Sequence, residues 1–192
     1  MRKRSPISPP LASSAGIQGE PTCYCRGERR AGSDNDGRKV GHVLFNPAAE
    51  NILASASGDF TVKIWDIGTG QSSLSLRHTD IVQSLSWNAS GSMLVTTSRD
   101  KKIRVWDVRQ EKPVHEAPGH AGAKSSRVVW LGEHNRFATT GFSKMSERQI
   151  ALWEPGTLEP IGGFTMLDSI SGVCMPFWGK PIFSFQNNAE PS

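Results

Sequence analysis

Three observations predict an all-β repeat fold, an incomplete β-propeller, for this chain. The stretch 59–66 ends in Trp65-Asp66, and the stretch 100–107 ends in Trp106-Asp107, 41 residues later. Each stretch follows two short segments that have the composition of β-strands, and one more such segment comes after it. Short turns rich in Gly, Asn, Asp and Pro separate these segments. A period of roughly 40 to 45 residues with four strands per repeat is typical of a propeller blade, so we expect consecutive four-stranded blades.

The first blade is expected over residues 38–77, with strands at 40–45, 52–57, 61–66 and 71–76. Apolar and β-branched residues dominate the first three of these segments, and the fourth is more polar, as expected for an outer strand. Pro47 ends the first strand, Gly58 begins the turn before the third, and Gly70 ends the turn before the fourth.

The same order repeats twice more and then breaks off. The second blade is expected over 78–118, with strands at 81–87, 93–97, 102–107 and 112–115. The third is expected over 119–168, with strands at 127–131, 136–140, 149–153 and 158–164. Trp153 follows Trp106 by 47 residues, which indicates an insertion in the turn 141–148. Residues 169–178 are expected to start a fourth blade with one strand, so the sequence predicts about three blades of the WD40 type.

Both ends of the chain differ in composition from the repeats. Residues 1–37 mix Pro, Ser, Gly and Arg without apolar periodicity, so we expect a disordered basic arm, and 179–192 an unstructured tail. The net charge is +4 and hydrophobic residues make up 36% of the chain. This charge would fit a partner with an acidic surface, whether nucleic acid, membrane or protein, but mild basicity of this kind is more often a solvated surface than a nucleic-acid footprint. No apolar run is long enough to cross a bilayer, so no membrane span is expected.

In the WD repeat pattern that these stretches resemble, a tryptophan N–H bonds a strand hydroxyl ten residues earlier. That hydroxyl meets a histidine from the preceding loop, and the aspartate of the tight turn orients the imidazole. The matching positions are Ser55, Asp59 and Trp65 in the first blade, His78, Thr96, Asp100 and Trp106 in the second, and His120 and Trp153 in the third. Such a network satisfies buried polar groups and fixes the register of a blade.

The first blade lacks the histidine of this pattern. Asp36 stands nine residues before Phe45, at the distance that separates His78 from Trp87. Either the network of this blade is incomplete, or the sequence before residue 38 is not its natural lead-in.

No catalytic or ligand-binding constellation is recognisable. Histidine, aspartate and hydroxyl side chains recur together, but no oxyanion-hole glycine motif accompanies them, which favours the structural interpretation over nucleophilic catalysis. The sequence has no G-x-x-x-x-G-K-[ST] phosphate loop and no H-E-x-x-H metal motif. Its 3 cysteines lack C-x-x-C spacing. We therefore expect a non-enzymatic binding module without a metal or a cofactor.

The third blade carries the most specific signal. Residues 137–153, with the insertion Gly-Phe-Ser-Lys-Met-Ser-Glu-Arg at 141–148, closely resemble the segment that marks coronins, actin-filament regulators with a seven-bladed propeller. The stretches 40–47, 100–107 and 171–178 agree, so the resemblance covers residues 38–178. It implies a non-enzymatic scaffold that binds actin filaments (F-actin) in the cytoplasm, at the cortical actin cytoskeleton.

The resemblance also implies partners for the family's full-length members, which restrain the Arp2/3 complex and oligomerise through a C-terminal coiled coil. This chain has no match to the family's basic N-terminal signature, its later blades or its coiled coil. Filament crosslinking and regulation of the Arp2/3 complex are therefore not expected of it.

Five basic residues are candidates for contacts with an acidic filament. They lie at or beside the turns between second and third strands, which a propeller gathers on one rim: Arg99, Lys101, Lys102, Lys144 and Arg148. Binding through such a rim should be sensitive to salt. The alternative for each residue is a solvated turn charge.

Two other functions stay open on the sequence alone. One is a generic WD40 scaffold for a different protein, and the other is a truncated propeller fragment without activity of its own. An open propeller exposes blade faces and unpaired strand edges, so self-association through these edges is also expected.

Overall fold

The computed structural model describes residues 38–179, and the expectations for residues 1–37 and 180–192 lie outside this part. The described residues form three four-stranded antiparallel sheets, and no helix occurs among them. The first sheet contains β1 (Val40–Phe45), β2 (Ile52–Ser57), β3 (Thr61–Asp66) and β4 (Gln71–Arg77). The second contains β5 (Val82–Trp87), β6 (Met93–Ser98), β7 (Lys102–Asp107) and β8 (Pro113–Pro118). The third contains β9 (Arg127–Trp130), β10 (Phe137–Phe142), β11 (Arg148–Trp153) and β12 (Pro160–Asp168).

Each sheet is a meander in which consecutive strands pair through short turns, as expected for a propeller blade. The turn between the second and third strands has a residue with positive φ at the same place in all three blades: Phe60 (φ 68°), Lys101 (φ 65°) and Ser146 (φ 64°). This residue lies one position before the third strand in the first two blades and two positions before it in the third, where the backbone must reverse sharply.

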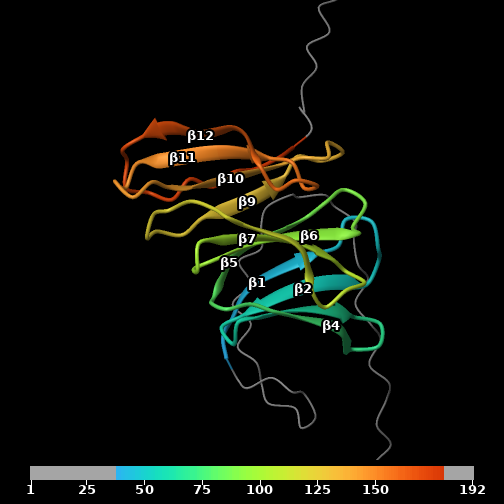
Figure 1. Ribbon diagram of the computed structural model, residues 1–192. Coiled ribbons are helices and arrows are strands. Elements are labelled where there is room, and N and C mark those ends of the chain that lie inside the picture. The colour runs from blue at the N-terminus through green and yellow to red at the C-terminus, as the bar shows by residue number, and fades with distance from the viewer. Residues whose placement is uncertain (1–37, 180–192) are drawn as a thin grey trace, which may run out of the picture.

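The three blades stack face to face in chain order (Figure 1). Their first strands are neighbours and run parallel, since the Asn46 side chain after β1 donates to the Gly91 carbonyl, 45 residues later. In the next pair the backbone N–H of Trp130 in β9 donates to the Ser86 hydroxyl in β5, 44 residues earlier. Equivalent turns of all three blades therefore lie along the same side of the stack, at the same end of the strands.

Two apolar layers hold the stack together. The layer between the first and second blades contains ten buried residues: Ala54, Ala56, Val62, Ile64, Leu76, Val82, Leu85, Trp87, Leu94 and Trp106. The layer between the second and third blades contains nine: Val95, Ile103, Val105, Val128, Trp130, Phe137, Ala151, Trp153 and Leu158. Burial of this surface drives the blades together, and the middle blade contributes one face to each layer.

The insertion in the third blade lengthens the hairpin as well as its turn. Gly141 and Phe142 belong to β10 and Arg148 begins β11, so the turn covers only 143–147 rather than the expected 141–148. The expected start of a fourth blade is corrected as well, because 170–178 forms no strand. No second strand pairs with this segment in the described part of the chain, so it has no ladder of hydrogen bonds.

The segment 170–178 nevertheless lies where a next first strand would lie. The Thr140 hydroxyl donates to the Cys174 carbonyl at 2.7 Å, as the Thr97 hydroxyl donates to the Ser126 carbonyl at 3.2 Å one blade earlier. Ser126 precedes Trp130 by four residues, and Cys174 precedes Trp178 by four. The repeat therefore continues in position, although not in secondary structure.

Candidate protein-binding rim

A buried chain of hydrogen bonds braces the second blade. Trp106 Nε1–H donates to the Thr96 hydroxyl oxygen at 3.0 Å, and Thr96 Oγ1 lies 3.0 Å from His78 Nε2. His78 Nδ1 lies 3.2 Å from the Leu76 carbonyl oxygen, which can only accept, so the proton of the neutral ring resides on Nδ1. Nε2 then accepts from the Thr96 hydroxyl, so every polar group in this series of hydrogen bonds has a partner.

Asp100 does not orient the imidazole as the sequence pattern suggested, since the Leu76 carbonyl takes that role. Its carboxylate instead accepts from Arg104 Nη2 at 2.6 Å, from the Ser98 hydroxyl at 2.5 Å and from the Thr79 hydroxyl. Arg104 is itself buried and its Nε lies 2.6 Å from a Glu116 carboxylate oxygen. Asp100 therefore anchors a charged network that closes the β6–β7 turn.

These surroundings determine the protonation of the buried groups. Burial lowers the pKa of His78 to about 4, with a further contribution from the positive charge of Arg104. Burial also lowers the pKa of His120. Burial alone would raise the pKa of Asp100, but hydrogen bonds from Arg104, Ser98 and Thr79 outweigh it and hold this pKa well below its ordinary value. Both histidines are neutral at physiological pH, and Asp100 is ionised.

The third blade contains the same series of hydrogen bonds, with a different sequence spacing between the threonine and the tryptophan. Trp153 Nε1–H donates to the Thr139 hydroxyl oxygen at 2.7 Å, and His120 Nε2 lies 3.0 Å from the same oxygen. Thr139 was missed from the sequence because it precedes Trp153 by 14 residues rather than ten, and the insertion that shifts it was the available signal. Gly141 leaves room for the ring, since a Cβ there would lie 2.4 Å from His120 Cγ.

The first blade contains a shorter series of these hydrogen bonds. Trp65 Nε1–H donates to the Ser55 hydroxyl oxygen at 2.8 Å. Asp59 accepts from the Thr61 backbone N–H at 3.0 Å and from the Thr61 hydroxyl at 2.7 Å, so it closes the β2–β3 turn. The position expected for a histidine, Asp36, lies outside the described residues.

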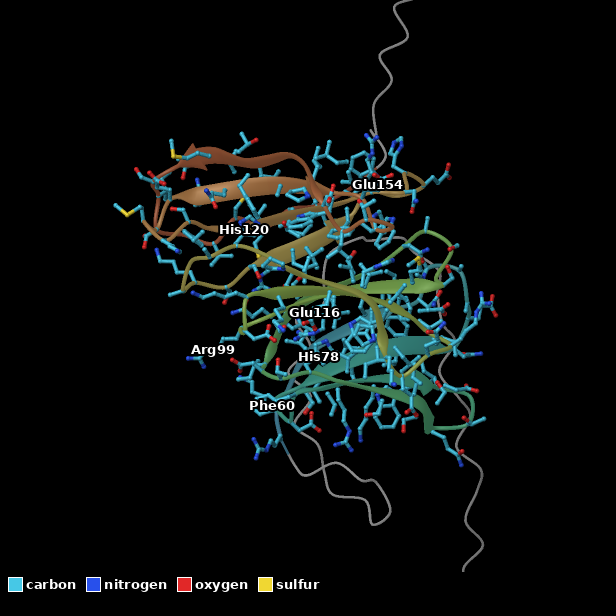
Figure 2. The ribbon with its side chains drawn as sticks, in the orientation of Figure 1. Phe60, His78, Arg99, Glu116, His120 and Glu154 are labelled. Atoms are coloured by element: carbon cyan, nitrogen blue, oxygen red, sulfur yellow. The ribbon has the colours of Figure 1, made fainter. Side chains whose placement is uncertain are left out.

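The turns at the two ends of the strands form two rims of opposite charge. The basic rim consists of the β2–β3, β6–β7 and β10–β11 turns with the segments that enter each first strand: 38–39, 58–60, 78–81, 99–101, 119–126, 143–147 and 169–172. The acidic rim consists of the turns at the other end of the stack: 46–51, 67–70, 88–92, 108–112, 131–136 and 154–159. Figure 2 shows Phe60 and Arg99 at the basic end and Glu154 at the opposite end.

The two rims carry opposite net charge. On the basic rim six cations face four carboxylates: Arg38, Lys39, Arg99, Lys101, Lys124 and Lys144 against Asp59, Asp80, Asp100 and Glu147. On the acidic rim five carboxylates face three cations: Glu50, Glu111, Glu133, Glu154 and Glu159 against Arg109, Lys112 and Arg136. The stack therefore presents an electrostatic polarity along its strands.

The five basic residues singled out from the sequence fall into two groups. Lys102 pairs with Glu116 at 2.5 Å, and Arg148 pairs with Asp168, so both charges are neutralised within their own blades. Arg99 and Lys144 are exposed, and their side chains make no hydrogen bond or ion pair within residues 38–179. Lys101 is exposed and donates to the Ala121 carbonyl at 2.8 Å, which leaves its charge uncompensated.

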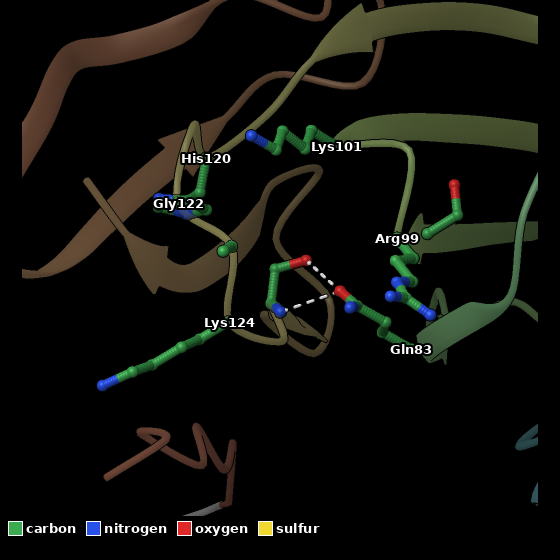
Figure 3. Close-up of a pocket in the computed structure, with 9 residues that line it drawn as sticks. Gln83, Arg99, Lys101, His120, Gly122 and Lys124 are labelled. Carbon is green, nitrogen blue, oxygen red and sulfur yellow. Dashed lines mark hydrogen bonds between the residues drawn. The ribbon is translucent and has the colours of Figure 1, made fainter. Parts of the chain in front are cut away.

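A shallow pocket lies between the second and third blades. One of the cations that line it, Lys124, was not singled out from the sequence. Arg99, Lys101 and Lys124 line the pocket together with Ser126, whose backbone N–H donates to Gln83 Oε1 at 3.0 Å (Figure 3). Lys124 donates to the Ser171 carbonyl at 3.0 Å and lies over the Phe142 ring. It lies in the loop before β9, where no repeat position marks it in the sequence.

The described residues contain neither a cluster of metal ligands nor a membrane-spanning helix. Among residues 38–179, no three His, Cys, Asp or Glu side chains are placed to hold a metal ion. The same part of the chain contains no helix that is both long enough and apolar enough to traverse a bilayer.

Similarity to known proteins agrees with this architecture. The family described as WD domain, G-beta repeat (WD40) matches residues 31–66 and 70–107. The WD40 domain of Toxoplasma gondii coronin superposes with a TM-score of 0.66 at 30% sequence identity, over 69% of this chain and 35% of that one. The three blades thus define a WD-repeat β-propeller segment.

Relatives by sequence narrow the class further. Coronin-like protein crn1 of Schizosaccharomyces pombe is 63% identical over 142 residues, and the coronin-like protein of Saccharomyces cerevisiae is 54% identical over 145. These matches cover 73% and 74% of this chain, and human Coronin-2A is 39% identical over 147 residues. The chain belongs to the coronin family. It spans 24% and 22% of the length of the two fungal relatives.

Proposed function

We propose that this chain binds actin filaments through its basic rim, as a non-enzymatic part of a coronin-like WD-repeat protein. The resemblance of the third-blade insertion to the coronin segment supplies the choice of partner. The charge polarity of the blade stack carries the physical argument, because actin filaments are acidic. The site of action that follows is the cytoplasmic actin cytoskeleton at the cell cortex.

The availability of the cations supports this proposal. Arg99 and Lys144 are exposed and form no ion pair within residues 38–179, whereas Asp100 of the same rim is paired with Arg104. Asp59 and Glu147 accept from neutral hydroxyls and keep their charge, so the positive excess of the rim comes from its larger number of cations. An acidic surface that approaches this rim therefore meets free positive charge, which speeds association and makes it depend on salt.

The buried His–Thr–Trp chains support a role without catalysis. In both chains the threonine oxygen accepts from a tryptophan and also contacts the histidine, so it is enclosed by the fold. A nucleophile must instead reach its substrate. The low pKa of His78, about 4, also makes this ring a poor general base near neutral pH.

Co-sedimentation with actin filaments tests the proposal. The full chain should sediment with filaments at about 50 mM salt and much less at about 300 mM, because exposed charges are screened. The double variant Arg99→Glu/Lys144→Glu should bind on the order of tenfold more weakly at low salt, since it reverses two unpaired charges on the rim.

The acidic rim offers a control with the same change of net charge. The variant Arg109→Glu/Lys112→Glu reverses two exposed cations at the opposite end of the stack and should bind like the wild-type chain. Circular dichroism and gel filtration establish that each sample is folded and discrete. Absence of filament binding by a folded wild-type chain would refute the proposal, and equal losses in both variants would refute the assignment to the basic rim.

A further inference from the structure

An apolar side chain stands out on the basic rim. Met145 is 81% exposed, the largest exposure of any large apolar residue in the part of the chain that the structure describes. It lies in the 143–147 turn between β10 and β11, within the insertion that distinguishes the third blade. It contributes to neither of the two apolar layers between the blades.

The turn that carries Met145 is held in one conformation by Ser143. The Ser143 hydroxyl donates to the Glu147 carboxylate at 3.0 Å and accepts from the backbone N–H groups of Met145 at 3.1 Å and Glu147 at 3.3 Å. The backbone closes the turn as well, since Ser143 N–H donates to the Glu147 carbonyl at 2.8 Å. Five residues thus form a preorganised loop, which reduces the entropy lost when a partner binds it.

Met145 lies on the rim that has the excess of cations, in a turn that carries both Lys144 and Glu147. Lys144 precedes it and has no partner within residues 38–179. The equivalent turn of the second blade carries Arg99 and Lys101, and that of the first blade carries Phe60, which is 37% exposed. The rim therefore places apolar groups in its two outer turns and free cations between and beside them, a composition suited to an acidic protein surface that also offers an apolar pocket.

We propose that Met145 is an apolar anchor of this rim, and that it enters an apolar pocket within the acidic surface of the filament. The inference rests on the proposed function and assigns the apolar contact of the same site. The cations bring the two surfaces together, whereas burial of the flexible, polarisable methionine side chain slows dissociation. Loss of the anchor therefore weakens binding without changing its dependence on salt.

Three single variants of the full chain test this role in the co-sedimentation assay. Met145→Ser should raise the Kd about tenfold, the size expected for a well-buried interface side chain. Met145→Leu keeps the apolar volume and should bind within about twofold of wild type. Ile67→Ser removes an apolar side chain that is 47% exposed from the acidic rim and should have no effect. Because Met145 is exposed, none of its variants should lower the stability of the fold.

The outcomes distinguish a failure of the Met145 contact from a failure of the proposed filament binding. A weaker Met145→Ser variant with an unchanged salt slope, together with normal binding by the other two, supports the anchor. Unchanged binding of Met145→Ser, in the presence of a real loss for Arg99→Glu/Lys144→Glu, overturns the anchor and leaves the proposed function standing. No filament binding by the wild-type chain overturns both.

Discussion

Replacement of Thr96 by valine tests whether the buried chain in the second blade stabilises the fold. Thr96 is fully buried, and its oxygen accepts from Trp106 Nε1 at 3.0 Å and meets His78 Nε2 at 3.0 Å. Valine matches the shape of threonine but can make neither hydrogen bond. Two buried polar groups would then lose their partner, and each costs about 1 to 3 kcal/mol. We expect the free energy of unfolding to fall by roughly 2 to 6 kcal/mol.

Urea denaturation at pH 7.5, followed by circular dichroism, measures this loss. A domain of ordinary stability has only about 5 to 15 kcal/mol, so Thr96→Val should move the midpoint far toward lower urea. Ser55→Ala is the matched comparison in the first blade, where, within residues 38–179, the hydroxyl oxygen accepts from Trp65 without a histidine contact. It should cost about 1 kcal/mol. A loss below about 0.5 kcal/mol for Thr96→Val would refute the argument that this chain stabilises the blade.

Two further predictions concern the histidines. The pKa of His78 falls from an ordinary value near 6.5 to about 4, so the unfolded chain binds more protons than the folded one between these values; stability is complete above about pH 6.5 and should fall by about 3 kcal/mol as the pH drops to 4. An NMR titration that places His78 near pH 6.5 would contradict this. Gly141→Ala drives a Cβ to within 2.4 Å of the His120 ring and should cost about 1 to 3 kcal/mol in urea denaturation, whereas Gly156→Ala, which meets no atom within 4 Å, should be close to neutral.

Much of the fold could be predicted because the sequence signals are local. The bounds of β1, β2, β3 and β7 equal those of the strands expected from apolar composition and turn residues. Strands with weaker composition were less well placed: β12 runs from Pro160 to Asp168, whereas 158–164 was expected. Two register shifts between β11 and β12 disturb the alternation on which such predictions depend.

The candidate site was less predictable because it depends on contacts across blades and strands. The pattern of hydroxyl and tryptophan ten residues apart located Ser55 and Thr96, but the lengthened β10–β11 hairpin moved the third hydroxyl to Thr139. Composition could not show that Asp168 lies opposite Arg148 and neutralises it. Nor could it show that the loop before β9 brings Lys124 to the pocket that Arg99 also lines. Such pairings are set by register and packing rather than by any local pattern.

Lysine reactivity measured with and without filaments tests the central claim most directly. Brief acetylation of the folded chain, followed by mass spectrometry, reports the accessibility of each lysine. If the basic rim faces the filament, Lys101 and Lys144 should become several-fold less reactive when filaments are present, and Lys112 on the acidic rim should stay unchanged. Protection of Lys112 with Lys101 and Lys144 still reactive would contradict the account.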